Sequence, residues 1–76
     1  MELKNFIENF ANQFDETDAS VFLANTVFKE LDEWSSIMAL SIIAMIDDEY
    51  EVAIKGDDIR KSTTIEDLYT IVKSKK

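Results

Sequence analysis

The chain carries sixteen acidic side chains but neither histidine nor cysteine, and this combination limits the chemistry it can perform. Without imidazole or thiol groups it cannot build a Ser-His or Cys-His nucleophile, or a metal site made of those ligands. No pair of carboxylates stands out, and Asp57-Asp58 lacks the ligand spacing of an EF-hand loop. A single glycine cannot supply a glycine-rich phosphate loop. We therefore expect no enzyme, but a protein that carries or binds something.

Ser36 is the residue best suited to a chemical role, because it stands at the start of a predicted helix. A serine there has a structural explanation, since its hydroxyl can accept a hydrogen bond from an amide of the first turn. The free amides and the positive end of the helix dipole also suit a phosphodiester anion. An exposed serine at this position needs no base of its own when another enzyme modifies it. From the serine alone, capping is the stronger interpretation.

Three apolar patterns with helical spacing predict the elements that position Ser36. The first buried face contains Leu3, Phe6, Ile7, Phe10 and Phe14. The second contains Ala39, Ile42, Ile43, Ile46 and Tyr50. The third, in a shorter helix, contains Ile65, Leu68, Tyr69 and Val72.

The start of the last helix is marked by the spacing of a capping box, Thr63 with Glu66, or alternatively Thr64 with Asp67. Before it, Gly56 predicts a turn that is followed by about one helical turn. No pair of strands with hairpin chemistry is present. The sequence therefore predicts an all-α fold.

Residues 15–34 form a connection of about twenty residues, which is long for a loop without structure of its own. It is not a polar linker, because it contains Val21, Phe22, Leu23, Val27, Phe28, Leu31 and Trp34. We expect it to pack across the bundle, with a short helix near Ala19 to Ala24.

The outer side of the second helix begins apolar and ends acidic, whereas a helix that serves only the core is usually polar there. This side contains Ile37, Leu40, Ser41, Ala44, Asp48 and Glu51. Exposed, Ile37 and Leu40 would form a docking surface with an apolar centre and a charged rim. Alternatively, the long loop covers both residues as ordinary core. The pattern itself favours neither.

A net charge of −8 limits the classes of molecule that the protein is expected to bind. Nucleic acids and anionic membranes are poor partners, since binding to phosphates depends on Lys and Arg. A basic protein surface is the natural complement. The most apolar stretch, Ile37 to Ile46, is much shorter than the roughly 20 residues that span a bilayer. We expect one domain over residues 1–76, monomeric and cytoplasmic, without membrane insertion.

The segment from Trp34 to Tyr50 resembles the modification site and second helix of acyl carrier proteins. Those proteins read Asp-Ser-Leu, then an apolar helix that ends in several acids and an aromatic residue. Here Ser36-Ile37 falls on their Ser-Leu, and Asp47-Asp48-Glu49-Tyr50 falls on their acidic run and terminal Phe. The segments Val52–Ile54 and Lys61–Leu68 are similar to the third and fourth helices of the family. The resemblance covers essentially the whole chain.

This resemblance implies an acyl-carrier-like four-helix bundle, with three main helices, one short helix and a long first loop. It also implies that a phosphopantetheinyl transferase attaches 4'-phosphopantetheine from coenzyme A to Ser36. The arm would hold acyl groups as thioesters for a fatty-acid pathway or a specialised polyketide or lipid pathway. Acyl-transferring or synthase enzymes with basic patches would dock on Ile37, Leu40, Ala44, Asp47 and Asp48. A peptidyl or aminoacyl carrier, or an unmodified helical adaptor with a basic partner, are the alternatives.

Three positions depart from the pattern of the family. Ser35 stands where the family has Asp, Ser41 stands where an acid often projects, and Trp34 is unusual just before the site. The two missing charges indicate a specialised carrier with dedicated enzymes. Of the two serines, Ser36 is the predicted attachment point, because it is in register with Tyr50 and precedes Ile37. Ser35 is left to share the capping of the helix.

Overall fold

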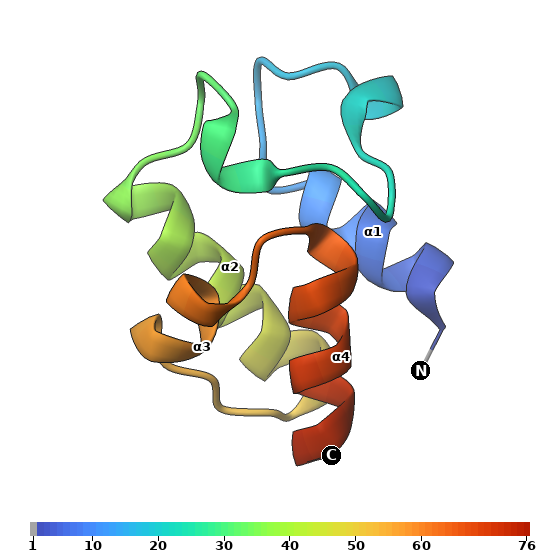
Figure 1. The fold of residues 1–76 in the computed structure, drawn as a ribbon, viewed down its shortest axis with the longest axis vertical. Coiled ribbons are helices and arrows are strands. Elements are labelled where there is room, and N and C mark those ends of the chain that lie inside the picture. The colour runs from blue at the N-terminus through green and yellow to red at the C-terminus, as the bar shows by residue number, and fades with distance from the viewer. Residues whose placement is uncertain (1) are drawn as a thin grey trace.

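The computed structural model describes residues 2–76, and these residues form four α-helices and two short 3-10 helices (Figure 1). The α-helices are α1 (Leu3–Ala11), α2 (Ser36–Tyr50), α3 (Gly56–Lys61) and α4 (Ile65–Lys75). The 3-10 helices, η1 (Ala19–Val21) and η2 (Phe28–Glu30), both lie in the connection between α1 and α2. The described chain contains no strand. The predicted all-α fold, with one short helix and a long first loop, is confirmed.

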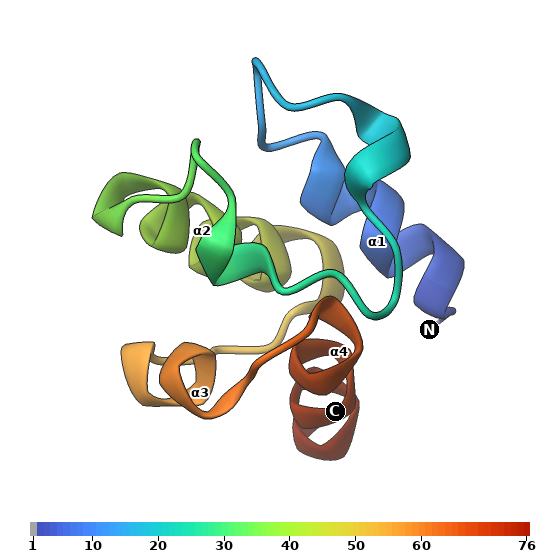
Figure 2. The same ribbon diagram turned by 45° about the horizontal axis from the view of Figure 1, so that its top comes forward.

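The helices enclose a common core rather than lying in one layer. α1 packs against both α2 and α4, and α3 packs against α4. Figures 1 and 2 show that the long connection crosses one end of this bundle before the chain enters α2. Across residues 2–76 there is no helix with the length and apolar character that a bilayer crossing requires.

The core is built from the apolar faces that the sequence predicts. From α1, Phe6 and Phe10 are fully buried, and from α2, Ile42 and Ile46 are fully buried. α4 contributes Ile65, Leu68 and Val72, also fully buried. Burying such side chains is the main favourable contribution to folding, worth roughly 1.5–3 kcal/mol for each large apolar residue.

Phe14 is buried, but it does not belong to the α1 face on which it was predicted. α1 ends at Ala11, and the chain continues through tighter turns in which Gln13 N–H donates to the Phe10 carbonyl and Phe14 N–H to that of Ala11. The shift from α to 3-10 spacing brings Phe14 into contact with Phe10, with ring centroids 5.6 Å apart. Helix ends commonly tighten in this way.

The long connection packs across the bundle, as predicted. Its residues Phe22 and Phe28 are buried, and Phe28 is fully enclosed. The connection is also bonded to the start of α4, where Ile65 N–H donates to the Thr26 carbonyl and Glu66 N–H to that of Ala24. The short helix expected near Ala19 to Ala24 is present as η1, whereas η2 was not predicted.

The cap of α4 is Thr64, not Thr63. The Thr64 hydroxyl accepts from Asp67 N–H at 3.1 Å, and Asp67 Oδ2 accepts from Thr64 N–H at 3.0 Å, so the two close a reciprocal capping box. The first-named pair, Thr63 with Glu66, is wrong, because Thr63 N–H donates to Asp67 instead. The predicted turn of helix after Gly56 is present as α3.

Candidate functional site

The start of α2 separates the two serines. Ser35 is the N-cap, with extended backbone, and its hydroxyl accepts a hydrogen bond from Met38 N–H at 3.2 Å. Its carbonyl accepts from Ala39 N–H, the first bond of the helical ladder. Ser35 therefore caps the helix, and it does so alone rather than sharing the cap as predicted.

Ser36 is the first residue of α2 and is exposed. Within residues 2–76, its hydroxyl makes no hydrogen bond to side chain or backbone, and the amides of Ser36 and Ile37 have no acceptor. No histidine exists to activate the hydroxyl. The Ser36 hydroxyl is thus accessible from solvent, and no residue among 2–76 forms a hydrogen bond to it that could activate it as a nucleophile.

Trp34 fixes the approach of the chain to this site. Its ring stands edge-on to Phe28, with centroids 5.0 Å apart, and stacks on Phe14 at 6.4 Å. Trp34 N–H also donates to the Leu31 carbonyl at 2.9 Å. Because Phe14 and Phe28 are buried, these contacts anchor the residue two positions before Ser36 on the core.

The outer side of α2 is open to solvent. Ile37 is 74% exposed and Leu40 is 65% exposed, so the long loop does not cover them. Ala44, Asp47 and Asp48 are also exposed and continue along the same helix, whereas Ser41 is half-buried. The five residues predicted to contact partners therefore lie on one accessible helix, with the apolar pair next to Ser36 and the acids toward the other end.

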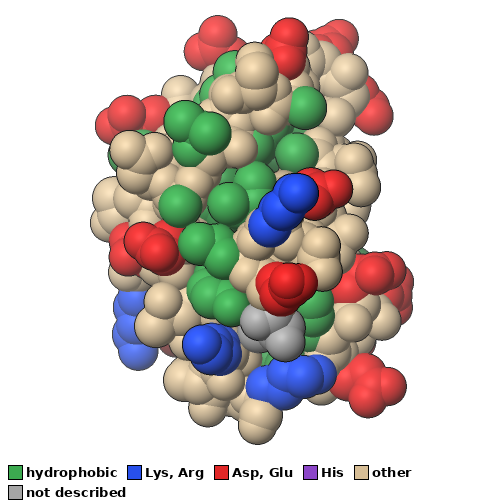
Figure 3. Space-filling model, turned by 90° about the vertical axis from the view of Figure 1, so that its right-hand side faces the viewer, with side chains coloured by type: hydrophobic (Ala, Val, Ile, Leu, Met, Phe, Trp, Pro, Cys, Tyr) green, Lys and Arg blue, Asp and Glu red, His purple; other side chains and the backbone are tan. Residues whose placement is uncertain are grey.

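A second pair of exposed apolar residues consists of Val21, the last residue of η1, and Leu23, two residues after it. The space-filling view of the α1 side shows hydrophobic side chains in a band, with both acidic and basic side chains around it (Figure 3). No pattern in the sequence separates these two residues from the rest of the apolar connection.

A cleft of about 590 Å³ opens beside Ser36, between the first half of α2, η2 and α3. Ser35 and Ser36 lie on its wall. Its apolar lining consists of Trp34, Ala39, Leu40, Ile43 and Ile59. Pockets that hold small ligands have volumes of roughly 300–1,000 Å³ and mostly apolar walls. The site therefore combines an exposed hydroxyl with an adjacent open cleft whose volume lies in that range.

Two cations, Lys29 and Arg60, complete the lining of the cleft, together with Gly56. Lys29 comes from η2 and Arg60 from α3, about thirty residues apart. Sequence reasoning identified neither as a site residue. Helical periodicity describes one element at a time, so it carries no signal for a cavity formed where two separate elements meet.

Acidic side chains are spread over the surface, and the described residues contain no group of three or more that could hold a metal ion. The Glu33 carboxylate is held in place by three hydrogen bonds, which it accepts from Asp15 N–H, Glu16 N–H and the Thr17 hydroxyl. The Thr17 hydroxyl, above all, holds the pKa of Glu33 below its usual value. These hydrogen bonds tie Glu33 to the start of the loop.

No protein-family model matches the chain, and neither the curated proteins nor the solved structures searched contain a significant match.

Proposed function

We propose that the protein is an acyl carrier, with 4'-phosphopantetheine attached to the Ser36 hydroxyl. The observation that carries the proposal is the setting of Ser36, which is exposed, is relieved of capping by Ser35, and lies on the wall of a ligand-sized cleft. A serine that served only the helix would be expected to make the cap itself.

The residues present fit the phosphodiester of such an arm. The unpaired amides of Ser36 and Ile37 lie at the positive end of a 15-residue helix, where an anion is favoured. In the attachment step the Ser36 oxygen forms a bond to the β-phosphorus of coenzyme A. The phosphoanhydride bond breaks, adenosine 3',5'-bisphosphate leaves, and the serine proton passes to the transferase.

When attached, the arm supplies the thiol that this chain lacks, and the acyl group is held on it as a thioester. The chain itself supplies presentation and recognition. The apolar wall of the cleft, with Leu40 and Ile43, offers shelter for part of an acyl chain.

The outer side of α2 supports docking of the enzymes that modify and use the carrier. Ile37, Leu40 and Ala44 supply an apolar centre, and Asp47 and Asp48 supply charge for a basic patch. Ser35 and Ser41, at positions where related carriers often have acids, favour dedicated partners of a specialised lipid or polyketide pathway over those of general fatty-acid synthesis.

Intact mass tests this function directly. The unmodified protein is incubated with coenzyme A, magnesium and a broad-specificity phosphopantetheinyl transferase, next to the Ser36→Ala and Ser35→Ala variants. We expect one phosphopantetheine on the wild type and on Ser35→Ala, and none on Ser36→Ala. An unchanged wild-type mass would reject the carrier function in favour of an unmodified adaptor, and label on Ser36→Ala would move the site.

A further inference from the structure

The charge of the cleft beside Ser36 is opposite to that of the protein. The chain has sixteen acids and eight bases, yet the charged residues that line the cleft are Lys29 and Arg60, and no acid lines it. In an acidic protein this local reversal calls for an explanation, because random placement would favour carboxylates. The cavity therefore offers an environment for a negative group that the rest of the surface would repel.

The two cations are not equivalent. The Arg60 guanidinium forms an ion pair with Asp57, one turn earlier on α3, so its charge is largely offset. The Lys29 ammonium donates to the carbonyls of Ile59 at 3.3 Å and Arg60 at 3.1 Å. Carbonyl oxygens orient the ammonium but do not neutralise it, and it retains a third N–H. Among residues 2–76, no carboxylate lies within ion-pair distance of Lys29.

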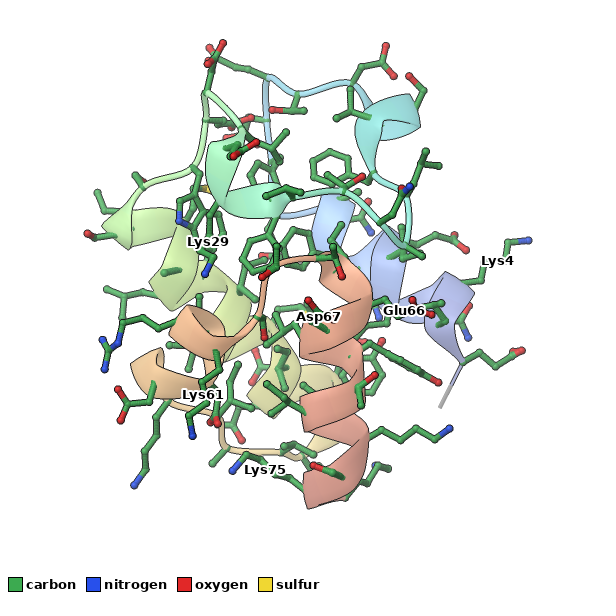
Figure 4. The ribbon with its side chains drawn as sticks, viewed as in Figure 1. Lys4, Lys29, Lys61, Glu66, Asp67 and Lys75 are labelled. Carbon is green, nitrogen blue, oxygen red and sulfur yellow. The ribbon has the colours of Figure 1, made fainter. Side chains whose placement is uncertain are left out.

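Lys29 is also half-buried, so the two carbonyls at the end of α3 replace part of the water around its ammonium. Its ammonium bonds at the end of α3 and its side chain lines the same cavity as Trp34, Leu40 and Ile43. Figure 4 shows Lys29 in this region, between η2 and α3, whereas Lys61 points away from it. A ligand anion in the cleft would offset the charge and form a charge-assisted hydrogen bond, which is among the stronger contacts available.

We infer that this cleft selects an apolar chain that carries a carboxylate, with the carboxylate beside Lys29 and the chain against the apolar wall. For the carrier proposed above, the inference means that the cargo is an acyl group with a second, free carboxylate. This part of the inference rests on that proposed function. The binding of such a ligand by the cleft does not require the arm, so the two can fail separately.

Trp34 provides the readout, because it lines the cleft and is the single tryptophan of the chain. Its fluorescence is followed while the unmodified protein is titrated with octanoate or with 1-octanol at constant ionic strength. We expect octanoate to bind about tenfold more tightly than octanol, the effect of one charge-assisted contact. The net charge of −8 opposes this preference, so long-range attraction cannot produce it.

Lys29→Met removes the charge and keeps the apolar stem, and we expect it to abolish the preference while affinity for octanol stays. Lys29→Arg should retain the preference. Lys61→Met is the matched control, since it makes the same change in net charge at an exposed position of α3 outside the cleft. Because the readout is a ratio of two affinities, a general loss of stability in Lys29→Met would lower both and leave the ratio unchanged.

The inference would be overturned if the wild type bound octanoate and octanol with equal affinity, or if the ratio of these affinities were the same in Lys29→Met and wild type. Lys29 would then serve only to connect η2 to α3 through its hydrogen bonds. Binding of neither ligand would also overturn the inference. None of these results touches the mass gain at Ser36, which tests the carrier function independently. With the arm attached, a glutaryl thioester should change Trp34 fluorescence more than a pentanoyl thioester, and only in proteins that keep Lys29 or Arg at this position.

Discussion

The Ser35 hydroxyl accepts a hydrogen bond from Met38 N–H, with 3.2 Å between oxygen and nitrogen, and this bond caps α2. Ser36, the next residue, is exposed and makes no part of that cap. Two serines in sequence therefore have different surroundings, although their side chains are chemically identical. One hydroxyl does not have to serve both purposes, because Ser35 caps the helix and Ser36 stays available for modification.

This division predicts different costs for removing the two hydroxyls. Ser35→Ala should lower the free energy of unfolding by about 1 kcal/mol, the usual effect of losing a serine N-cap. Ser36→Ala should change it by less than about 0.5 kcal/mol, because the side chain is exposed and unbonded. Urea denaturation of both variants measures the difference. Equal losses, or a larger loss for Ser36→Ala, would contradict the assigned cap.

The helices could be predicted because the sequence pattern that marks each one lies within a short stretch of the chain. A repeat of apolar residues every three or four positions marks a buried face wherever it occurs, and Phe6, Phe10, Ile42, Ile46 and Leu68 lie where that rule puts them. The rule says less about where a helix stops. Phe14 satisfies the repeat but lies beyond Ala11, after the backbone has changed to tighter turns.

The candidate site was predictable only in part. Ser36 and the outer side of α2 follow from one helix and its start, whereas the cleft depends on Lys29 and Arg60 from η2 and α3. No local pattern links residues so far apart in sequence. The sequence left open whether Thr63 or Thr64 caps α4, because both threonines have an acid three residues later. The structure shows the alternative pair, Thr64 with Asp67.

Glu33 should hold the two ends of the long loop together. Its carboxylate accepts from Asp15 N–H at 2.9 Å and Glu16 N–H at 3.1 Å, and from the Thr17 hydroxyl. We expect Glu33→Ala to lower the melting temperature and to speed hydrogen exchange of the Asp15 and Glu16 amides by about tenfold. The control is Asp32→Ala, an exposed neighbouring acid whose carboxylate makes none of these bonds. Unchanged exchange at both amides would show that Glu33 does not order the loop.

Asp67 should contribute to the pH dependence of stability. The Thr64 N–H, and next the Thr63 N–H, donate to its carboxylate and hold its pKa below the ordinary value (Figure 4). A carboxyl whose pKa is lower in the folded state stabilises the fold above its unfolded pKa, which is about 3.9, and ceases to do so as pH falls through the folded pKa. Asp67→Asn should therefore lower the melting temperature at pH 7 and have a much smaller effect near pH 3.

Glu66→Gln serves as the comparison for Asp67→Asn, because it removes one negative charge from the same first turn of α4. Within residues 2–76, the Glu66 side chain makes no hydrogen bond or ion pair of its own. If both variants show the same dependence on pH, the capping box does not account for the lowered pKa of Asp67.

Phe28 should be essential to the packing of the loop against the bundle. It is fully buried, and its ring meets those of Phe10 at 5.3 Å and Trp34 at 5.0 Å. Phe28→Ala should cost about 3–5 kcal/mol of unfolding free energy, as expected for a large aromatic residue in a core. Leu23→Ala, in the same loop but 58% exposed, should cost less than about 0.5 kcal/mol. Comparable costs in denaturation would mean that the loop does not pack as described.

The exposed apolar pair on α2 gives the last prediction, which concerns recognition. Ile37 and Leu40 lie next to Ser36 and are mostly exposed, so they add little to the core. The double variant Ile37→Gln, Leu40→Gln should keep the unfolding free energy within about 1 kcal/mol of the wild type. Its modification by a phosphopantetheinyl transferase should have a kcat/KM about tenfold lower, because apolar anchors at the centre of an interface carry much of its binding energy.

The control for this effect is the double variant Val21→Gln, Leu23→Gln, which removes the other pair of exposed apolar residues. These residues lie at the end of η1 and just after it, away from the start of α2, so we expect their loss to leave the modification rate unchanged. The rates are measured by intact mass over time on folded proteins of equal concentration. If the two double variants are modified at the same rate, Ile37 and Leu40 do not form a specific docking site for the transferase. If only the α2 variant is modified more slowly than the wild type, the transferase recognises the helix that begins at Ser36.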